Sequence, residues 1–325
     1  MTFRILAIKG LALLGLLCTT NSAAFADAAF PSRPIRIIVP TAPGGTLDLT
    51  TRLYAQKMGE DLGQPVIVEN RPGGDTIPGT LAVKDAAADG YTLLAQAEGL
   101  LMVPQLRVEQ PFEPLKDFTG VGLMARFPFV MVVGGDQPDR TLADFIARAK
   151  ENSGKLTYAS AGVATPPHVV APMFLKAAGL ELLHVPYKGN GAALPDVVAG
   201  RVDMIFDGYI SSSSFLKAGK LRAIGIAGPK RTTPLPDVPT LMEAGVEFGP
   251  LSWLGIVAPA GTPDDAIARL WEALVRASKD PALSERVRAD GSEPASETAA
   301  EFNAFLTTEY KRMSDAITTL NLEKK

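Results

Sequence analysis

The chain has 325 residues, with 32 basic and 35 acidic side chains, one cysteine and a 46% share of hydrophobic residues. A chain of this length buries about three quarters of its unfolded surface, so it can form a stable core without disulfides, metals or cofactors. The mild acidity, with only two tryptophans and six tyrosines, argues against a nucleic-acid partner.

The first 26 residues are expected to be a secretory signal peptide. Arg4 and Lys9 supply positive charge at the N-terminal end of an apolar run, and Ala24-Phe25-Ala26 provides a small-x-small cleavage site. The apolar run is shorter than the roughly 20 residues that a spanning helix needs, which disfavours the alternative of a membrane anchor. Cys18 leaves lipoprotein processing as a second alternative, although Leu17 is bulkier than the small residue that such processing prefers.

Cleavage after Ala26 would leave 325 − 26 = 299 residues without cysteine and a net charge of 30 − 35 = −5. An exported protein without disulfides depends on its hydrophobic core for stability. We therefore expect a soluble, monomeric protein in the periplasm.

Residues 35–52 combine a strand, a turn and a helix start. An apolar strand over 35–39 is followed by Pro43-Gly44-Gly45, where the missing side chains let the backbone approach a ligand closely. Thr46 is a candidate N-cap, so the first free N–H groups of the helix are expected to point into the space above the strand. Such an arrangement can cradle an anion or a carboxylate.

Short apolar runs alternate with helical patterns along the rest of the chain, which predicts an α/β fold with mixed, mostly parallel sheets flanked by helices. Strands are predicted over 65–69, 91–95, 129–133, 183–186, 204–207, 223–227 and 253–258. Helices are predicted over 80–88, 141–150, about 168–178, 264–279 and 299–319, with Thr141 and Thr262 as caps. The serine run 211–214 is expected to be a flexible loop or a cap, and it could edge the cleft.

Residues 156–168 repeat the layout of the first cradle, with a strand, a Gly-containing loop and a helix start. Two lobes are therefore expected, one from residues 27–128 plus 253–325 and one from residues 129–252. The two cradles would face each other across a cleft, which is a favoured place for a ligand.

A series of short motifs runs through the chain in a fixed order. They include Pro43-Gly44-Gly45, Leu62-Gly63-Gln64-Pro65, Glu69-Asn70-Arg71-Pro72-Gly73, Asp89-Gly90-Tyr91-Thr92-Leu93-Leu94, His184-Val185-Pro186-Tyr187-Lys188-Gly189, Leu235-Pro236-Asp237-Val238-Pro239-Thr240 and Ala258-Pro259-Ala260-Gly261-Thr262-Pro263. By these motifs the chain resembles the Bug family, the periplasmic solute-binding proteins of tripartite tricarboxylate transporters. The resemblance implies a type II-like Venus-flytrap fold that closes on a small organic acid and delivers it to a membrane permease.

The resemblance also implies where a ligand would bind. One ligand carboxylate would meet the loop formed by Ala42, Pro43, Gly44, Gly45 and Thr46. The other end of the ligand would meet Ser160, Ala161, Gly162, Val163, Ala164 and Thr165, with His168, Asp207 and Gly208 nearby.

The chain departs from the family pattern at Gly74-Asp75-Thr76 and at Gln96-Ala97-Glu98. We expect Asp75, Thr76 and Glu98 to influence which acid is chosen, whether a monocarboxylate or a dicarboxylate. Two ionised acids near the cleft would repel a plain dicarboxylate and would suit a ligand that also carries an amine or several hydroxyls.

Catalysis is the main alternative from another class. Ser160, one of the two histidines (His168 or His184) and Asp207 could form a nucleophile triad, but Tyr158 stands where a nucleophile elbow needs glycine. Ser160 fits better as a hydroxyl donor to a carboxylate. His184 is expected to be structural, whereas His168 could contact the ligand or cap its own loop.

Other functions have less support. Two histidines without a suitable acidic cluster disfavour a metal site. Gly219-Lys220-Leu221 lacks the features of a phosphate-binding loop. An exported ligand sensor for a membrane kinase remains as a further alternative, since the same binding fold would serve it.

Overall fold

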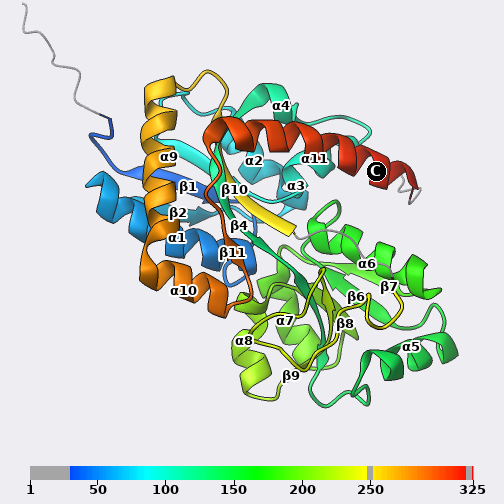
Figure 1. Cartoon of the computed structure of the whole chain (residues 1–325). Helices are drawn as coiled ribbons and strands as arrows, with labels where there is room; N and C mark the ends of the chain where they lie inside the picture. The colour runs from blue at the N-terminus through cyan, green and yellow to red at the C-terminus, as the bar shows by residue number, and fades with distance from the viewer. Residues whose placement is uncertain (1–29, 247–251, 320–323, 325) are drawn as a thin grey trace, which may run out of the picture.

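The computed structural model describes residues 30–246, 252–319 and 324. The predicted signal peptide, with Cys18, lies outside these residues. The described chain forms two lobes, each built on one mixed sheet flanked by helices (Figure 1).

Lobe 1 is built on a six-stranded sheet with the strand order β11-β4-β10-β3-β1-β2. Its strands are β1 (Ile35–Val39), β2 (Val66–Asn70), β3 (Thr92–Gln96), β4 (Phe118–Phe127), β10 (Ser252–Pro259) and β11 (Glu293–Pro294). Its helices are α1 (Thr46–Leu62), α2 (Ile77–Lys84), α3 (Gly99–Met102), α4 (Pro114–Asp117), α9 (Asp264–Lys279), α10 (Pro281–Ala289) and α11 (Ala299–Thr319), with short 3-10 turns at Gly74–Thr76 and Val103–Gln105.

Lobe 2 is built on a five-stranded sheet with the order β7-β6-β8-β5-β9. Its strands are β5 (Phe129–Gly134), β6 (Thr157–Ser160), β7 (Leu183–Pro186), β8 (Met204–Asp207) and β9 (Leu221–Ala227). Its helices are α5 (Leu142–Glu151), α6 (Pro166–Ala178), α7 (Asn190–Val198) and α8 (Tyr209–Lys217).

The two lobes are joined where β4 runs into β5 with only Pro128 between them, and the chain returns to lobe 1 along β10. Strand β4 leads the chain out of the first sheet and β10 leads it back, and these two strands pair antiparallel. In the second sheet the first strand, β5, pairs antiparallel with the last strand, β9. Parallel pairing is confined to β1 with β2 and β3, and to β6 with β7 and β8, in the described sheets. The sheets are mixed as predicted, but their parallel share is smaller than expected because of these crossing strands.

Helix α1 is fixed to its sheet by large side chains on one face. Tyr54 and Met58 are fully buried, as the apolar spacing of the sequence predicts. The Tyr54 hydroxyl donates to the Met124 carbonyl of β4 at 2.5 Å, and burial raises the pKa of Tyr54 to about 12. The start of α1 is therefore held in a defined position above the carboxyl end of β1.

Several predicted elements are confirmed. The predicted bounds of α9 and α11 match the structure, and Thr141 caps α5 in a capping box with Asp144. Two expectations are wrong. Helix α2 begins earlier than predicted because Pro78 is suited to a first helical turn. Pro263, and not Thr262, is the N-cap residue of α9, while the Thr262 hydroxyl donates to the Pro259 carbonyl.

Other elements were predicted only in part or not at all. The sequence patterns missed the ten-residue strand β4 and the helices α7 and α10, and of α8 they indicated only the end, before Gly219. The serine run 211–214 lies within α8 and is not a flexible loop, and Ser212 is fully buried. Within the described ranges, no helix is both long and apolar enough to cross a membrane.

Candidate functional site

We call residues 40–47 the first jaw, because they connect β1 to α1 and face lobe 2. Gly44 has φ +83°, a conformation that favours glycine, and its N–H donates to the Asp48 carboxylate at 2.9 Å. Asp48 is almost fully buried and also accepts from Asn70 and Arg52. These hydrogen bonds to the Asp48 carboxylate fix the turn, so the backbone of the first jaw is held in place.

The prediction that Thr46 caps α1 is wrong. Gly45 is the N-cap residue and Thr46 is the first residue of the helix. The Thr46 hydroxyl is hydrogen-bonded at 3.2 Å to the hydroxyl of Ser211 in lobe 2. The first N–H groups of a helix have no intrahelical partner, and Gly45, Thr46 and Leu47 line the cavity described below. The expected donor end of the helix is therefore present, one residue earlier.

We call residues 160–168 the second jaw, which connects β6 to α6. Ser160 is fully buried, and its hydroxyl is hydrogen-bonded to the Gly162 carbonyl and, at 2.6 Å, to His184 Nε2. Pro166 and Pro167 occupy the first turn of α6 and have no N–H groups to offer a ligand. Ser160 thus shapes the loop, which corrects the expectation that it donates to a ligand carboxylate.

The two histidines stack against this loop. The rings of His168 and His184 are 4.5 Å apart, and Tyr158 stacks on His184 at 4.9 Å. His168 Nδ1 accepts from the Ala164 N–H at 3.2 Å. Of the two roles left open for His168, the structure therefore shows the capping of its own loop.

The first jaw touches lobe 2 directly. The Ala42 N–H donates to the Lys188 carbonyl at 2.7 Å. A Cβ atom at Gly191 would lie 2.4 Å from the Pro43 carbonyl oxygen, and one at Gly208 would lie 2.3 Å from the Thr46 hydroxyl. The structure is therefore a closed form in which glycines permit backbone contact between the lobes.

A cavity of about 60 Å³ lies between the closed jaws. This volume exceeds the roughly 10–15 Å³ that one water molecule requires. Residues of both lobes line the cavity, including residues of β4, β5 and β10 at the junction of the lobes. The lining consists of Thr41, Gly45, Thr46, Leu47, Thr76, Gln96, Ala97, Phe127, Phe129, Ala161, Thr165, Pro166, Pro167, Asn190 and Leu254.

The lining combines apolar walls with neutral polar groups, and among its described residues none carries a charged side chain. Gln96 Nε2 donates to the Thr76 hydroxyl at 3.3 Å. Thr41 Oγ1 and Asn190 Oδ1 are buried and have no hydrogen-bond partner within the described chain. Because buried polar atoms are normally paired, these two atoms mark places where a bound molecule would complete the hydrogen bonding.

Asp207 does not line the cavity, but it holds Asn190, which does, in place. It is fully buried and accepts hydrogen bonds from Asn190 Nδ2 at 2.7 Å and from the Ser211 hydroxyl. Burial raises the pKa of Asp207 to about 6, although these hydrogen bonds oppose the rise. Asp207 orients Asn190 so that its oxygen, and not its amide nitrogen, is left for a ligand.

Of the two acids expected near the cleft, Glu98 lines neither cavity of the site, whereas Asp75 lies at its edge. Glu98 is buried behind the site, where it accepts from the Ser252 hydroxyl at 3.0 Å and the Trp253 N–H at 3.2 Å. Asp75 forms an ion pair with Arg107 and keeps its place on the cavity surface. The expectation of two acids beside the ligand is therefore reduced to Asp75 alone.

Five of the predicted site residues line the cavity: Gly45, Thr46, Thr76, Ala161 and Thr165. Asp75 lines a second, outer cavity that adjoins it. Sequence reasoning missed the contributions of Thr41, Gln96, Ala97, Phe127, Phe129 and Asn190. Gln96 carried a usable signal, since it stands in a stretch that departs from the family pattern, whereas Asn190 and the two phenylalanines are brought in by packing.

The structure places the residues of the imagined nucleophile triad in separate roles. Ser160 and His184 are hydrogen-bonded to each other, but Asp207 is bonded to Asn190 and Ser211. Ser160 is also sealed from the cavity by full burial. In the part of the chain that the structure describes, no group of three metal-ligating side chains is placed to hold an ion.

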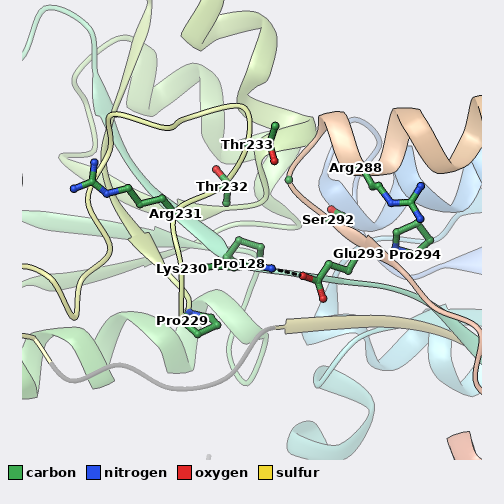
Figure 2. A pocket seen from close by; sticks show the side chains of 11 residues that line it. Pro128, Pro229, Lys230, Arg231, Thr232, Thr233, Arg288, Ser292, Glu293 and Pro294 are labelled. Carbon is green, nitrogen blue, oxygen red and sulfur yellow. Dashed lines mark ion pairs between the residues drawn. The ribbon is translucent and has the colours of Figure 1, made fainter.

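A larger hollow, of about 390 Å³, lies beside the junction of the lobes. It is lined by Pro128, whereas Phe127 and Phe129 line the inner cavity, as expected when successive side chains of an extended chain point to opposite faces. Figure 2 shows Lys230 of lobe 2 paired with Glu293 of lobe 1 at 3.1 Å, while Arg231 and Arg288 lie at opposite ends. Because these charges do not converge on one point, the inner cavity is the better candidate site.

Comparison with known proteins shows the family of the chain. The tripartite tricarboxylate transporter family receptor model matches residues 50–322. The UPF0065 protein from the tcbD-tcbE intergenic region of a Pseudomonas species is 38% identical over 290 residues, which are 89% of this chain and 86% of that protein.

Several solved structures of other proteins are similar to this structure over most of the chain. The periplasmic binding protein BugD is 31% identical with a TM-score of 0.87, over 91% of this chain and 100% of that one. MatC from Rhodopseudomonas palustris, solved with bound malate, is 30% identical with a TM-score of 0.84, over 89% and 100%. An R. palustris protein solved with adipate is 29% identical with a TM-score of 0.86, over 90% and 98%.

Glu98 is expected to make the stability of the protein depend on pH. Burial raises the pKa of Glu98 from its ordinary 4.5 to about 7. The folded state then binds more protons than the unfolded state between these values, so stability falls as pH rises through this window and levels off above it. The Glu98→Gln substitution should remove up to about 3 kcal/mol of this dependence.

Urea unfolding between pH 4.5 and pH 8 measures this difference. The matched control is Glu272→Gln on the exposed face of α9, which should keep the wild-type pH profile. If Glu98→Gln keeps the same profile as well, the buried carboxyl has no such role.

Proposed function

The chain belongs to the tripartite tricarboxylate transporter receptor family, and from that premise we propose that it is a solute-binding protein of the periplasm. It captures a small carboxylate-bearing molecule between its lobes and delivers it to the membrane permease of a tripartite tricarboxylate-type transporter. The predicted signal peptide, residues 1–26, is in keeping with this location.

One observation carries the proposal. The N-terminus of α1, whose first N–H groups have no partner within the helix, lies on a cavity that both lobes line and that has no charged side chain among its described lining. A carboxylate would be bound there by backbone N–H groups and by the helix dipole. The malate and adipate in the two R. palustris structures are themselves carboxylates, which supports this ligand class.

The remaining contacts narrow the ligand. The aromatic rings of Phe127 and Phe129 and the side chain of Leu254 offer an apolar wall to its carbon chain. Asn190 Oδ1 requires a hydrogen-bond donor, such as a hydroxyl group or a retained water molecule. The ligand we propose is thus a short carboxylate with few other polar groups.

Capture without chemistry is part of the same proposal. The site residues bind and enclose, and the one nucleophile considered, Ser160, is fully buried behind its loop. Opening and closing would take place about Pro128 and the crossing strands, with lobes formed by residues 27–128 plus 253–325 and by residues 129–252.

A thermal-shift screen tests the ligand class. The panel consists of short monocarboxylates, dicarboxylates, tricarboxylates, aromatic acids and sugar acids, each paired with its uncharged amide. We expect at least one acid to stabilise the protein, by about 2.7 kcal/mol at 100 times its dissociation constant, while the matching amide has no effect. Equal stabilisation by the amide, or none by any acid, would contradict the proposal.

Replacing Gly191 tests the need for closure. A Cβ atom there would lie 2.4 Å from the Pro43 oxygen and 2.9 Å from the Gly45 nitrogen, which prevents the jaws from meeting. Gly191 lies in α7, where alanine favours a helix by up to about 1 kcal/mol, so the lobes should fold normally.

We therefore expect Gly191→Ala to lower affinity for an identified acid by about tenfold or more, a change of about 1.4 kcal/mol. Calorimetric titration measures the affinity, and the melting temperature of the unliganded variant serves as the control for folding. Unchanged affinity would show that capture does not require this contact.

A further inference from the structure

Four consecutive N–H groups of the second jaw, those of residues 162–165, are already occupied by the protein itself. The Gly162 N–H donates to the Ser160 hydroxyl, the Ala164 N–H to His168 Nδ1 and the Thr165 N–H to the Gly162 carbonyl. A fourth donor, the Val163 N–H, is bonded at 2.7 Å to the Oδ1 atom of Asp75, which belongs to lobe 1. The second jaw therefore differs from the first, whose helix N-terminus faces the cavity.

Asp75 is built firmly into this position. It lies in a turn in which Gly73, Gly74, Asp75 and Thr76 all have positive φ angles, of 111°, 51°, 53° and 72°. Such a conformation is costly for residues other than glycine and persists only where surrounding contacts enforce it. Here Asp75 forms its ion pair with Arg107, and the side chains of the pair are only 18% and 26% exposed.

Asp75 also stands on the path that a longer ligand would take. It lines an outer cavity of about 170 Å³ that shares Thr76 and Ala161 with the inner cavity. Lys188 lies on the rim of the outer cavity, but it is solvent-exposed. A chain that extends from the α1 end past Thr76 and Ala161 would thus bring its far end to the Asp75 carboxylate.

We propose that Asp75 is a specificity-determining residue that takes the place of a second ligand carboxylate at the second jaw. Its oxygen already occupies the Val163 N–H, and its partner Arg107 already has a carboxylate. A second carboxylate on the ligand would find these donors used and would face a like charge. The inference deepens the proposed function: the preferred ligand carries one carboxylate, at the α1 end, and a neutral far end.

Calorimetric titration with paired acids tests the proposal. The pairs are butyrate with succinate, hexanoate with adipate, and 3-hydroxybutyrate with malate, and each pair differs by one carboxylate. In the wild type we expect the monocarboxylate of a bound pair to bind at least about tenfold more tightly, since juxtaposed like charges are unfavourable. The Asp75→Asn variant frees Arg107 and weakens the bond to Val163, so it should reduce this ratio by about tenfold.

Asp61→Asn is the matched control. Asp61 has a similarly shielded side chain, 17% exposed, and also pairs with arginines, Arg269 and Arg276, at the far end of α1. This control should keep the wild-type ratio. If Asp75→Asn fails to fold, the wild-type ratio decides the matter by itself.

The outcomes separate the two proposals. If the wild type binds the dicarboxylate of a pair as tightly as its partner, or if Asp75→Asn leaves the ratio unchanged, the role of Asp75 is overturned while carboxylate capture stands. If the wild type binds none of these acids and no acid of the thermal-shift panel, the proposed function is overturned, and the role of Asp75 is overturned with it.

Discussion

The binding site depends on the direct backbone contact between the first jaw and lobe 2. The Ala42 N–H reaches the Lys188 carbonyl at 2.7 Å, and Gly191 and Gly208 lie against Pro43 and Thr46. No side chain larger than hydrogen fits at these two glycines when the lobes are closed. The cavity at the N-terminus of α1 is enclosed only because these contacts form.

The size of the free-energy contributions explains why closure of the lobes matters for affinity. A helix N-terminus contributes about 0.3–1 kcal/mol towards an exposed anion and up to about 2 kcal/mol when partly buried. Micromolar affinity requires about 8 kcal/mol, so the first jaw alone is insufficient. Enclosure by the second lobe excludes water, strengthens each hydrogen bond and buries the ligand's carbon chain against Phe127, Phe129 and Leu254. The proposed hinge at Pro128 would therefore contribute to binding as much as the residues of the cavity lining do.

Local sequence patterns predicted those parts of the protein that local chemistry determines. The strand, turn and helix of the first jaw follow from an apolar run, a Pro-Gly-Gly turn and helical spacing, and the bounds of α9 and α11 follow from their amphipathic repeats. The long strand β4 escaped prediction because it is buried along most of its length and shows no alternation of polar and apolar residues.

The direction of side chains could not be predicted in the same way. Glu98 and Asp75 are both acids in segments that depart from the family pattern, yet one stabilises the start of β10 and the other bridges the lobes. Asn190 enters the site because α7 packs beside β8 and Asp207 binds its amide nitrogen. These outcomes depend on contacts between residues far apart in the sequence.

Small-angle X-ray scattering, recorded with and without an acid shown to bind, is the most direct test of capture by lobe closure. Ligand should select the closed form, so we expect the radius of gyration to decrease on binding and the scattering of the complex to match the closed structure in Figure 1. An unchanged scattering curve with bound acid, or a complex more extended than this structure, would contradict capture between closing lobes.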